Sequence, residues 1–161
     1  MARLIHSDFV DVNAVSWCYW KGMEMRGDHA LISLHATDGD IHKGGYVAAN
    51  KMLWVLGNYS RFVRPGYVRV ALDGADDLDT LAATAFISPE GDRLVAVFVN
   101  SSFEDRPVEL SLPKAWKKKM TSVTSYRTDA RHDLARTVTG EGVNHVVAAR
   151  GVTTVVVELK K

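Results

Sequence analysis

The 161-residue chain is long enough for one globular domain, with or without a fragment of a second. Its apolar content of 47% can form a hydrophobic core, and its net charge of +1 gives no reason to expect nucleic acid or an anionic membrane surface as a partner. The single cysteine, Cys18, excludes an internal disulfide, and no apolar stretch approaches the roughly 20 residues of a membrane span.

The first 45 residues alternate between apolar and polar segments. Residues 2–10 predict an amphipathic helix with Leu4 and Ile5 on one face, together with two later apolar residues, Phe9 and Val10. Residues 13–20 form an apolar and aromatic run typical of a buried strand, in which Cys18 is expected to be a buried small hydrophobe. Residues 21–45 are rich in glycine, aspartate and histidine and predict a loop, with one short strand at 30–34.

A sharp corner follows. Apolar residues between positions 46 and 56 recur at helical spacing and predict a helix that ends at Pro65, which lacks an N–H. Gly66 can adopt a positive φ, and alternation then predicts a strand at 67–73. The arginines of this corner are expected to cap the helix and to pair with nearby carboxylates; they are Arg61, Arg64 and Arg69.

After Pro65 the sequence has the rhythm of short strands. Further strands are predicted at 81–88, 93–100, 106–112, 121–127, 144–149 and 152–159. Residues 89–92 (Pro-Glu-Gly-Asp) predict a hairpin turn, and the lysines at 117–119 are placed in a loop. The fold class expected is mainly β: an antiparallel β-sandwich at 65–161, preceded by an α/β segment at 1–64.

Two stretches carry a family resemblance. The run from Leu56 to Val70 (LGNYSRFVRPGYVRV) resembles the junction in family-30 glycoside hydrolases where the last helix of a (β/α)₈ barrel passes into a C-terminal β-sandwich. Residues 16–20 (SWCYW) resemble the eighth barrel strand of that family, with its Trp-x-x-Trp pattern. Residues 71–161 resemble the β-sandwich of that family in the spacing of their predicted strands and in the Val-Thr-Thr-Val sequence near the end. The resemblance implies that residues 1–64 are the last βα units of a partial barrel.

The resemblance also supplies candidate site residues. It places Trp17 at the barrel mouth beside the sugar that is cleaved, and Tyr19 and Trp20 are the further substrate-binding candidates. The alternative is that all three aromatic residues fill an interface between barrel and sandwich. Residues 21–24 (Lys-Gly-Met-Glu) stand where glucuronoxylan-cleaving members carry an arginine-rich loop, so the substrate stays open.

No catalytic residue is expected in this chain. Retaining glycosidases need two carboxylates about 5–5.5 Å apart, and the family carries them at the ends of the fourth and seventh barrel strands, upstream of this sequence. The glutamates present are Glu24, Glu90, Glu104, Glu109, Glu141 and Glu158, none with a framework that would raise its pKa. A barrel also takes about 250 residues. No cofactor is expected, and the spacing of His29, His35 and His42 is too weak a pattern to predict a metal site.

Three functions therefore stay open: the C-terminal fragment of a retaining β-glycosidase, a non-catalytic carbohydrate-binding or interaction module, and a structural remnant that oligomerises. Carbohydrate is the expected ligand of the parent enzyme. Without a barrel, residues 1–64 should expose apolar surface, which predicts a homo-oligomer or a partner that supplies the barrel. The start of the chain lacks a signal-peptide pattern, and the signal of a secreted or periplasmic parent would lie upstream.

Overall fold

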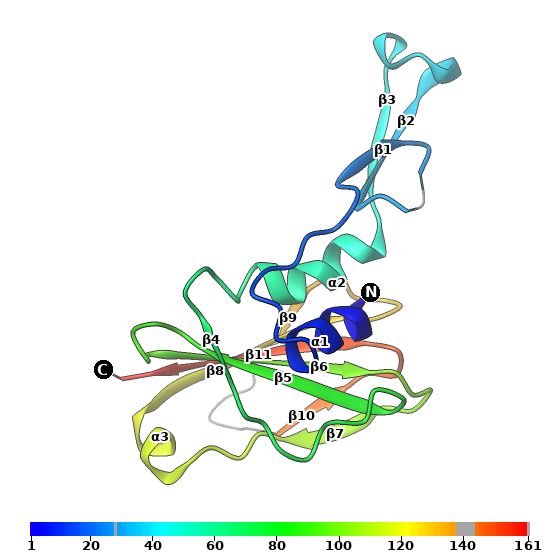
Figure 1. Ribbon diagram of the computed structural model, residues 1–161. Helices are drawn as coiled ribbons and strands as arrows, with labels where there is room; N and C mark the ends of the chain where they lie inside the picture. The colour runs from blue at the N-terminus through cyan, green and yellow to red at the C-terminus, as the bar shows by residue number, and fades with distance from the viewer. Residues whose placement is uncertain (28, 138–143, 161) are drawn as a thin grey trace.

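A six-stranded antiparallel sheet is the main element of the computed structural model, which describes residues 1–27, 29–137 and 144–160 (Figure 1). In spatial order its strands are β4 (Val68–Val70), β5 (Leu81–Ile87), β6 (Arg93–Asn100), β11 (Val152–Leu159), β8 (Met120–Thr128) and β9 (Ala135–Thr137). The hairpin predicted at 89–92 joins β5 to β6, with Ile87 opposite Leu94. The prediction of a mainly β fold is confirmed.

The central strands β6 and β11 are buried on both faces. Along β6, Leu94, Ala96 and Phe98 belong to one apolar cluster, and the residues between them, Val95 and Val97, belong to a second cluster on the opposite face. Strand β11 alternates in the same way. A strand that is covered on both faces is rich in apolar residues along its whole length. This explains why the sequence pattern that predicts a strand is clearest for these two strands.

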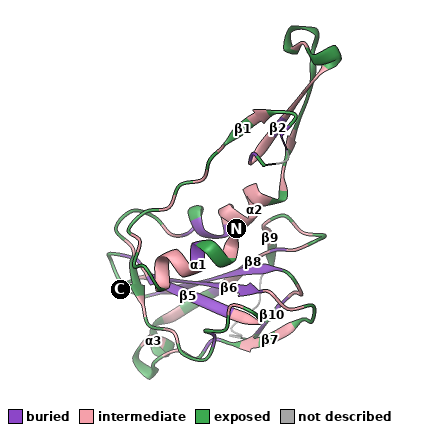
Figure 2. Cartoon of the chain, turned by 45° about the vertical axis from the view of Figure 1, so that its right-hand side comes forward, coloured by how far each residue is buried: buried purple, intermediate pink, exposed green. Residues whose placement is uncertain are grey.

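Two different layers cover the sheet (Figures 1 and 2). The helices α1 (Ala2–Val10) and α2 (Lys51–Ser60) lie on one face. On the other face lie the antiparallel pair β7 (Arg106–Glu109) and β10 (Asn144–Val147) and the short helix α3 (Lys114–Lys119), which stands where a loop was predicted. Among the described residues the second β-layer therefore has two strands, against six in the first.

Helix α2 is fixed to the sheet by a buried asparagine. The side-chain amide of Asn58 donates to Thr128 Oγ1 on β8 (2.8 Å), and Thr154 Oγ1 on β11 donates to the Asn58 carbonyl (2.7 Å). All three residues are buried. Since a buried polar group costs free energy unless it is hydrogen-bonded, this network defines where the helix lies on the sheet.

A second, smaller sheet projects away from the body of the molecule (Figure 1). We call residues 21–49 the arm. It contains β1 (Met23–Met25), β2 (Ile32–Ala36) and β3 (Gly45–Ala49), with β1 parallel to β2 and β2 antiparallel to β3. Two 3₁₀ turns, Thr37–Gly39 and Ile41–Lys43, join β2 to β3. Five large apolar residues of the arm are exposed: Met23, Met25, Ile41, Tyr46 and Val47.

The buried strand predicted at 13–20 is wrong. These residues form no strand, Val15 is fully exposed, and Cys18 is exposed rather than buried. No strand among the described residues pairs with this segment, so its backbone has no ladder to join and its apolar side chains have no layer to cover them.

The helix predicted from residue 46 is also partly wrong. Residues 45–49 are strand β3, where Tyr46 pairs with His35, and the helix begins only at Lys51. Apolar residues spaced three and four apart within a short run do not separate a helix from a strand. The helix ends at Ser60, before Pro65, and Gly66 has the predicted positive φ of 90°.

Smaller differences concern exposure and strand ends. Leu4 lies on the exposed side of α1, because Ile5 and the neighbouring His6 face the sheet instead. Strands β1 and β9 stand where none was predicted, and the strands expected at 67–73 and 106–112 are shorter. Within the described residues, no helix has both the length and the apolar character needed to cross a bilayer.

Candidate functional site

The segment that carries the candidate aromatic residues crosses from α1 to the arm as irregular chain (Figure 1). The indole Nε1 of Trp17 donates to Asp8 Oδ2 at 2.8 Å, which ties the segment to α1. The Tyr19 hydroxyl donates to the His29 carbonyl at 2.7 Å, which ties it to the arm. The two rings stack, with centroids 6.1 Å apart and planes 14° from parallel. The structure therefore brings Trp17 and Tyr19 together.

Trp20 does not join this pair. Its side chain is 85% exposed, and the peptide bond that follows it, to Lys21, is cis. Of the three predicted residues, then, two form one stacked unit and the third stands alone in solvent.

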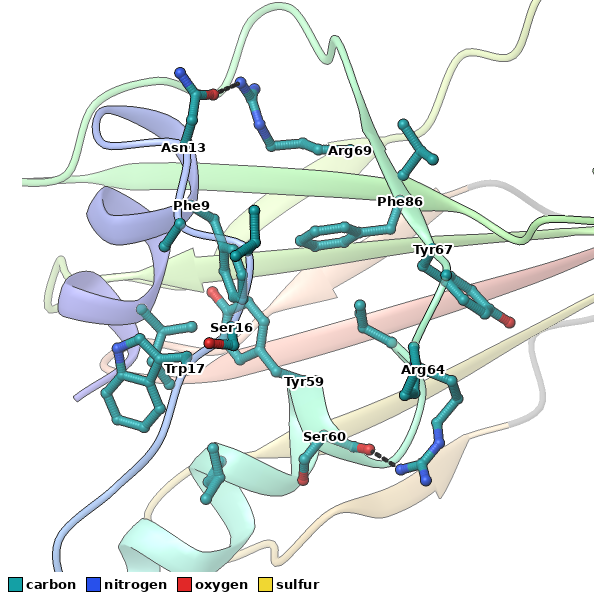
Figure 3. A pocket seen from close by; sticks show the side chains of 18 residues that line it. Phe9, Asn13, Ser16, Trp17, Tyr59, Ser60, Arg64, Tyr67, Arg69 and Phe86 are labelled. Atoms are coloured by element: carbon teal, nitrogen blue, oxygen red, sulfur yellow. Dashed lines mark hydrogen bonds between the residues drawn. The ribbon is translucent and has the colours of Figure 1, made fainter.

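A groove of about 660 Å³ opens beside Trp17, between α1, the segment 13–17, the end of α2 and the chain leading into β4 (Figure 3). Its apolar lining includes Ile5, Phe9, Leu56, Val63 and Phe86. The sequence did not predict this groove, because its walls come from five segments, the fifth being β5 with Phe86, that lie between residues 5 and 86.

Two arginines of the corner, Arg64 and Arg69, form the polar rim of the groove. Arg69 donates to Asn13 Oδ1 at 2.8 Å, and Arg64 donates to the Ser60 carbonyl at the end of α2, at 2.7 Å. Arg64 thus caps the helix as predicted. Arg61 instead lies over the rings of Phe62 and Tyr126.

Tyr59 is the one lining residue with an unsatisfied buried group. Its hydroxyl has no hydrogen-bond partner among the described residues, and burial raises its pKa, so the group stays a protonated donor. A buried O–H without an acceptor costs roughly 1–3 kcal/mol. The sequence predicted that Tyr59 lies near the end of a helix, but it gave no indication that its hydroxyl would lack a hydrogen-bond partner.

The groove is chemically suited to binding. None of its described lining residues is a carboxylate, a histidine or a cysteine, so it offers no general acid, base or nucleophile of these kinds. What it offers is an apolar floor, an aromatic edge and the hydroxyl groups of Ser16, Tyr59, Ser60 and Tyr67. This set fits the apolar face of a pyranose or a packed protein segment.

The glutamates are placed as ordinary surface groups. Glu24 on β1 pairs with Lys21, and Glu158 on β11 accepts from Arg93 Nε at 2.8 Å. Three more are exposed: Glu90, Glu104 and Glu109. Glu141 lies outside the described residues.

The histidines of the arm do not converge in the described part of the chain. No group of three or more candidate ligands is close enough there to hold a metal ion, and His35 stacks on Tyr46 with ring centroids 4.4 Å apart.

Comparison with known proteins connects this fold to sugar-cleaving enzymes, although no protein-family model matches the sequence. A conserved exported protein from Bacteroides fragilis is 28% identical with a TM-score of 0.81, over 96% of this chain and 32% of that chain. A family-30, subfamily-8 xylanase from Clostridium acetobutylicum is 19% identical with a TM-score of 0.75, over 98% of this chain and 37% of its own. A family-30 endoxylanase from Clostridium papyrosolvens is 22% identical with a TM-score of 0.71, over 98% and 36%.

The present chain thus spans about a third of the length of the structures that it matches. It has the fold of the C-terminal part of family-30 glycoside hydrolases, as the junction sequence predicted.

Proposed function

We propose that this chain is the C-terminal part of a retaining β-glycosidase that acts on a β-linked polysaccharide or oligosaccharide, with its catalytic carboxylates outside these 161 residues. The observation that carries the proposal is the match of 98% of this chain to the C-terminal part of two family-30 xylanases. Residues 1–64 would then be the last units of a partial barrel, and residues 65–161 the sandwich domain that packs against it.

The placement of the glutamates supports this division. Retaining catalysis needs one carboxyl group with a raised pKa, and burial in an apolar pocket is the usual way to raise it. Glu24 and Glu158 are each held by a cation, and the other described glutamates are exposed. None of these glutamates is buried in an apolar pocket.

The exposed surface of the first 64 residues supports it as well. The arm and the segment before it expose Val15, Trp20, Tyr46 and Val47, side chains that stable proteins usually cover. A barrel would supply strands beside residues 13–20 and a layer over the arm. In the absence of those strands, we expect the same surface to drive association with a second copy or with a chain that provides the barrel.

Trp17, Tyr19 and Trp20 are proposed as substrate contacts in the complete enzyme. The stacked Trp17–Tyr19 pair leaves one edge at the groove, and Trp20 leaves a whole ring in solvent, free to stack on a sugar. Replacing Trp20 with alanine in the complete enzyme should raise KM several-fold. Phe103→Ala, which removes an exposed aromatic ring in the loop between β6 and β7, should leave KM unchanged.

The experiment is hydrolysis of a panel of aryl β-glycosides and of β-linked xylan by the purified 161-residue chain and by its Glu24→Gln and Glu104→Gln variants. The proposal expects no turnover from any of the three. Turnover that disappears in Glu24→Gln and persists in Glu104→Gln would place an active site in this chain and would overturn the proposal.

A further inference from the structure

The arm sheet has two chemically different faces. Successive residues of a strand point to opposite sides, so the register of the three strands sorts the side chains of the arm into two sets. One face is apolar, and its members include Met23, Met25, Ile32, Leu34, Val47 and Ala49. The other face carries Glu24, Ser33, His35, Tyr46 and Ala48. The apolar face suits contact with further protein, and the mixed face stays available to a ligand of another kind.

The mixed face presents an aromatic ring that is already oriented. Tyr46 is the largest side chain on this face and is 64% exposed. Its ring stacks on that of His35, the residue opposite it in the ladder, with centroids 4.4 Å apart and planes 7° from parallel. The stack covers one side of the Tyr46 ring and leaves the other side to solvent. Because the ring is held before a ligand arrives, little conformational entropy is lost when a ligand stacks on it.

This aromatic pair continues the line of the proposed substrate contacts. The Tyr19 hydroxyl donates to the His29 carbonyl at the base of the arm, so the segment with the candidate aromatic residues leads directly into it (Figure 1). His35 is the fourth residue of β2 and lies about 10 Å along the strand from Ile32, where the arm begins. The active site of a (β/α)₈ barrel is built from the loops that follow its strands. As the loop after the eighth strand, the arm would extend the substrate-binding surface outward.

The charge of the arm favours a neutral ligand. Its sequence has three cationic and four anionic side chains: Lys21, Arg26 and Lys43 against Glu24, Asp28, Asp38 and Asp40. Two of the cations are held in ion pairs within the arm, Lys21 by Glu24 and Lys43 by Asp38. The near balance of charge provides no strong attraction for an anionic sugar.

We propose that Tyr46, held by His35, is a stacking platform for one pyranose unit of a neutral β-linked oligosaccharide, beyond the sugar whose bond is cleaved. The C–H face of a pyranose is apolar and flat enough to lie on the exposed side of the Tyr46 ring. The inference rests on the proposed function, because the barrel is what would bring the arm and the substrate together. It gives the arm a definite role, which is to bind a polymeric substrate at a distance from the reacting bond.

The test is an NMR titration of the 161-residue chain, followed through the ring protons of Tyr46 and His35. The probes are xylohexaose and cellohexaose, with glycerol at equal hydroxyl concentration. We expect weak, saturable shifts of both rings with at least one hexaose and none with glycerol. The absence of a shift with both hexaoses, or an equal shift with glycerol, would overturn the proposal.

Adjacent residues of β3 supply matched variants. Tyr46→Ala should weaken hexaose affinity at least tenfold, and Tyr46→Phe should retain it, because the ring remains. Val47→Ala is the control: this residue is also 64% exposed, but it lies on the apolar face, so affinity should not change. Unchanged affinity in Tyr46→Ala, or an equal loss in Val47→Ala, would contradict the proposal. The same holds if Tyr46→Ala alters only the sedimentation of the chain, since the ring would then be a contact between copies.

Kinetics of the complete enzyme separate this inference from the proposed function. Tyr46→Ala should raise KM for xylan several-fold and leave KM for an aryl β-xyloside unchanged, because the short substrate does not reach the platform. An unchanged KM for xylan would overturn the inference while the proposed function stands. Lack of turnover by the complete, unmodified enzyme would instead overturn the proposed function, and the titration would still decide whether Tyr46 binds sugar.

Discussion

The two sheets of this molecule contrast in what covers them. The six-stranded sheet has helices on one face and the β7–β10 pair on the other, and its central strands are almost wholly buried. The arm sheet contains apolar residues as well, yet Tyr46 and Val47 on β3 are both 64% exposed. Apolar strands alone do not make a core: they need a covering layer, and the arm lacks one in the described chain.

The largest difference should come from a charge placed in each sheet. Val97 on β6 is fully buried, so Val97→Asp would bury an unpaired carboxylate and should cost more than about 4 kcal/mol, enough to prevent folding. Val47→Asp on β3 should change the free energy of unfolding by less than about 0.5 kcal/mol. Urea unfolding of both variants measures this, and equal losses would contradict the contrast between the sheets.

A smaller loss is expected at the link between α2 and the body. Asn58→Ala removes the amide that bonds to Thr128 and leaves the buried Thr154 hydroxyl with one acceptor fewer, which should cost about 2–3 kcal/mol. Arg69→Ala removes an exposed hydrogen bond to Asn13 and should cost under about 0.5 kcal/mol. Thermal unfolding of the pair checks the difference, and a loss for Asn58→Ala as small as that of the control would show that the network does not hold the helix.

Acid should weaken the body through its buried histidines. Burial lowers the pKa of His6, which bonds to Thr84 at 2.7 Å, and of His145, from the ordinary 6.5. The unfolded chain therefore binds more protons below about pH 6.5 than the folded chain does, so stability is full above that pH and decreases as the pH falls. Urea unfolding between pH 7.5 and 5 should show this decrease. The double variant His6→Gln/His145→Gln should show a flatter dependence, and an unchanged slope would contradict the assignment.

The smallest effect on stability should come from making the arm polar. Tyr46→Ser with Val47→Ser should leave the unfolding midpoint of the body nearly unchanged, because neither side chain contributes to either apolar cluster. The same change should reduce self-association, since it removes exposed apolar surface. Sedimentation at increasing concentration checks this, and association that persists unchanged would mean that another surface is responsible.

The sequence predicted the covered strands of the large sheet better than the segments that have no covering layer. Strands β5, β6 and β11 were predicted almost to the residue, because both of their faces are buried within this chain and their apolar runs match their surroundings. The run 13–20 has the same apolar character but no neighbouring strand among the described residues, so the pattern predicted a burial that the structure does not contain. The apolar pattern of a segment predicts that it will be buried, but it does not show whether another segment is present to cover it.

Of the candidate site, the sequence predicted the aromatic residues that are neighbours in the chain, but not the contacts between distant segments. The stacking of Trp17 and Tyr19 follows from neighbouring aromatic residues, and a resemblance to a known junction pointed to them. The unsatisfied hydroxyl of Tyr59 and the unsatisfied ring of His145 depend on packing between segments that are distant in the sequence. A single sequence carries no local signal for a missing partner.

Hydrogen exchange of the 161-residue chain tests the central claim most directly, namely that the six-stranded sheet is covered on both faces within this chain while the arm sheet has no covering layer among the described residues. The amides of β1, β2 and β3 should exchange roughly a hundredfold or more faster than those of β6 and β11, because few buried contacts hold the arm. Protection of the arm equal to that of β6 in the monomer would contradict the claim, since it would mean that this sheet is stable without a covering layer.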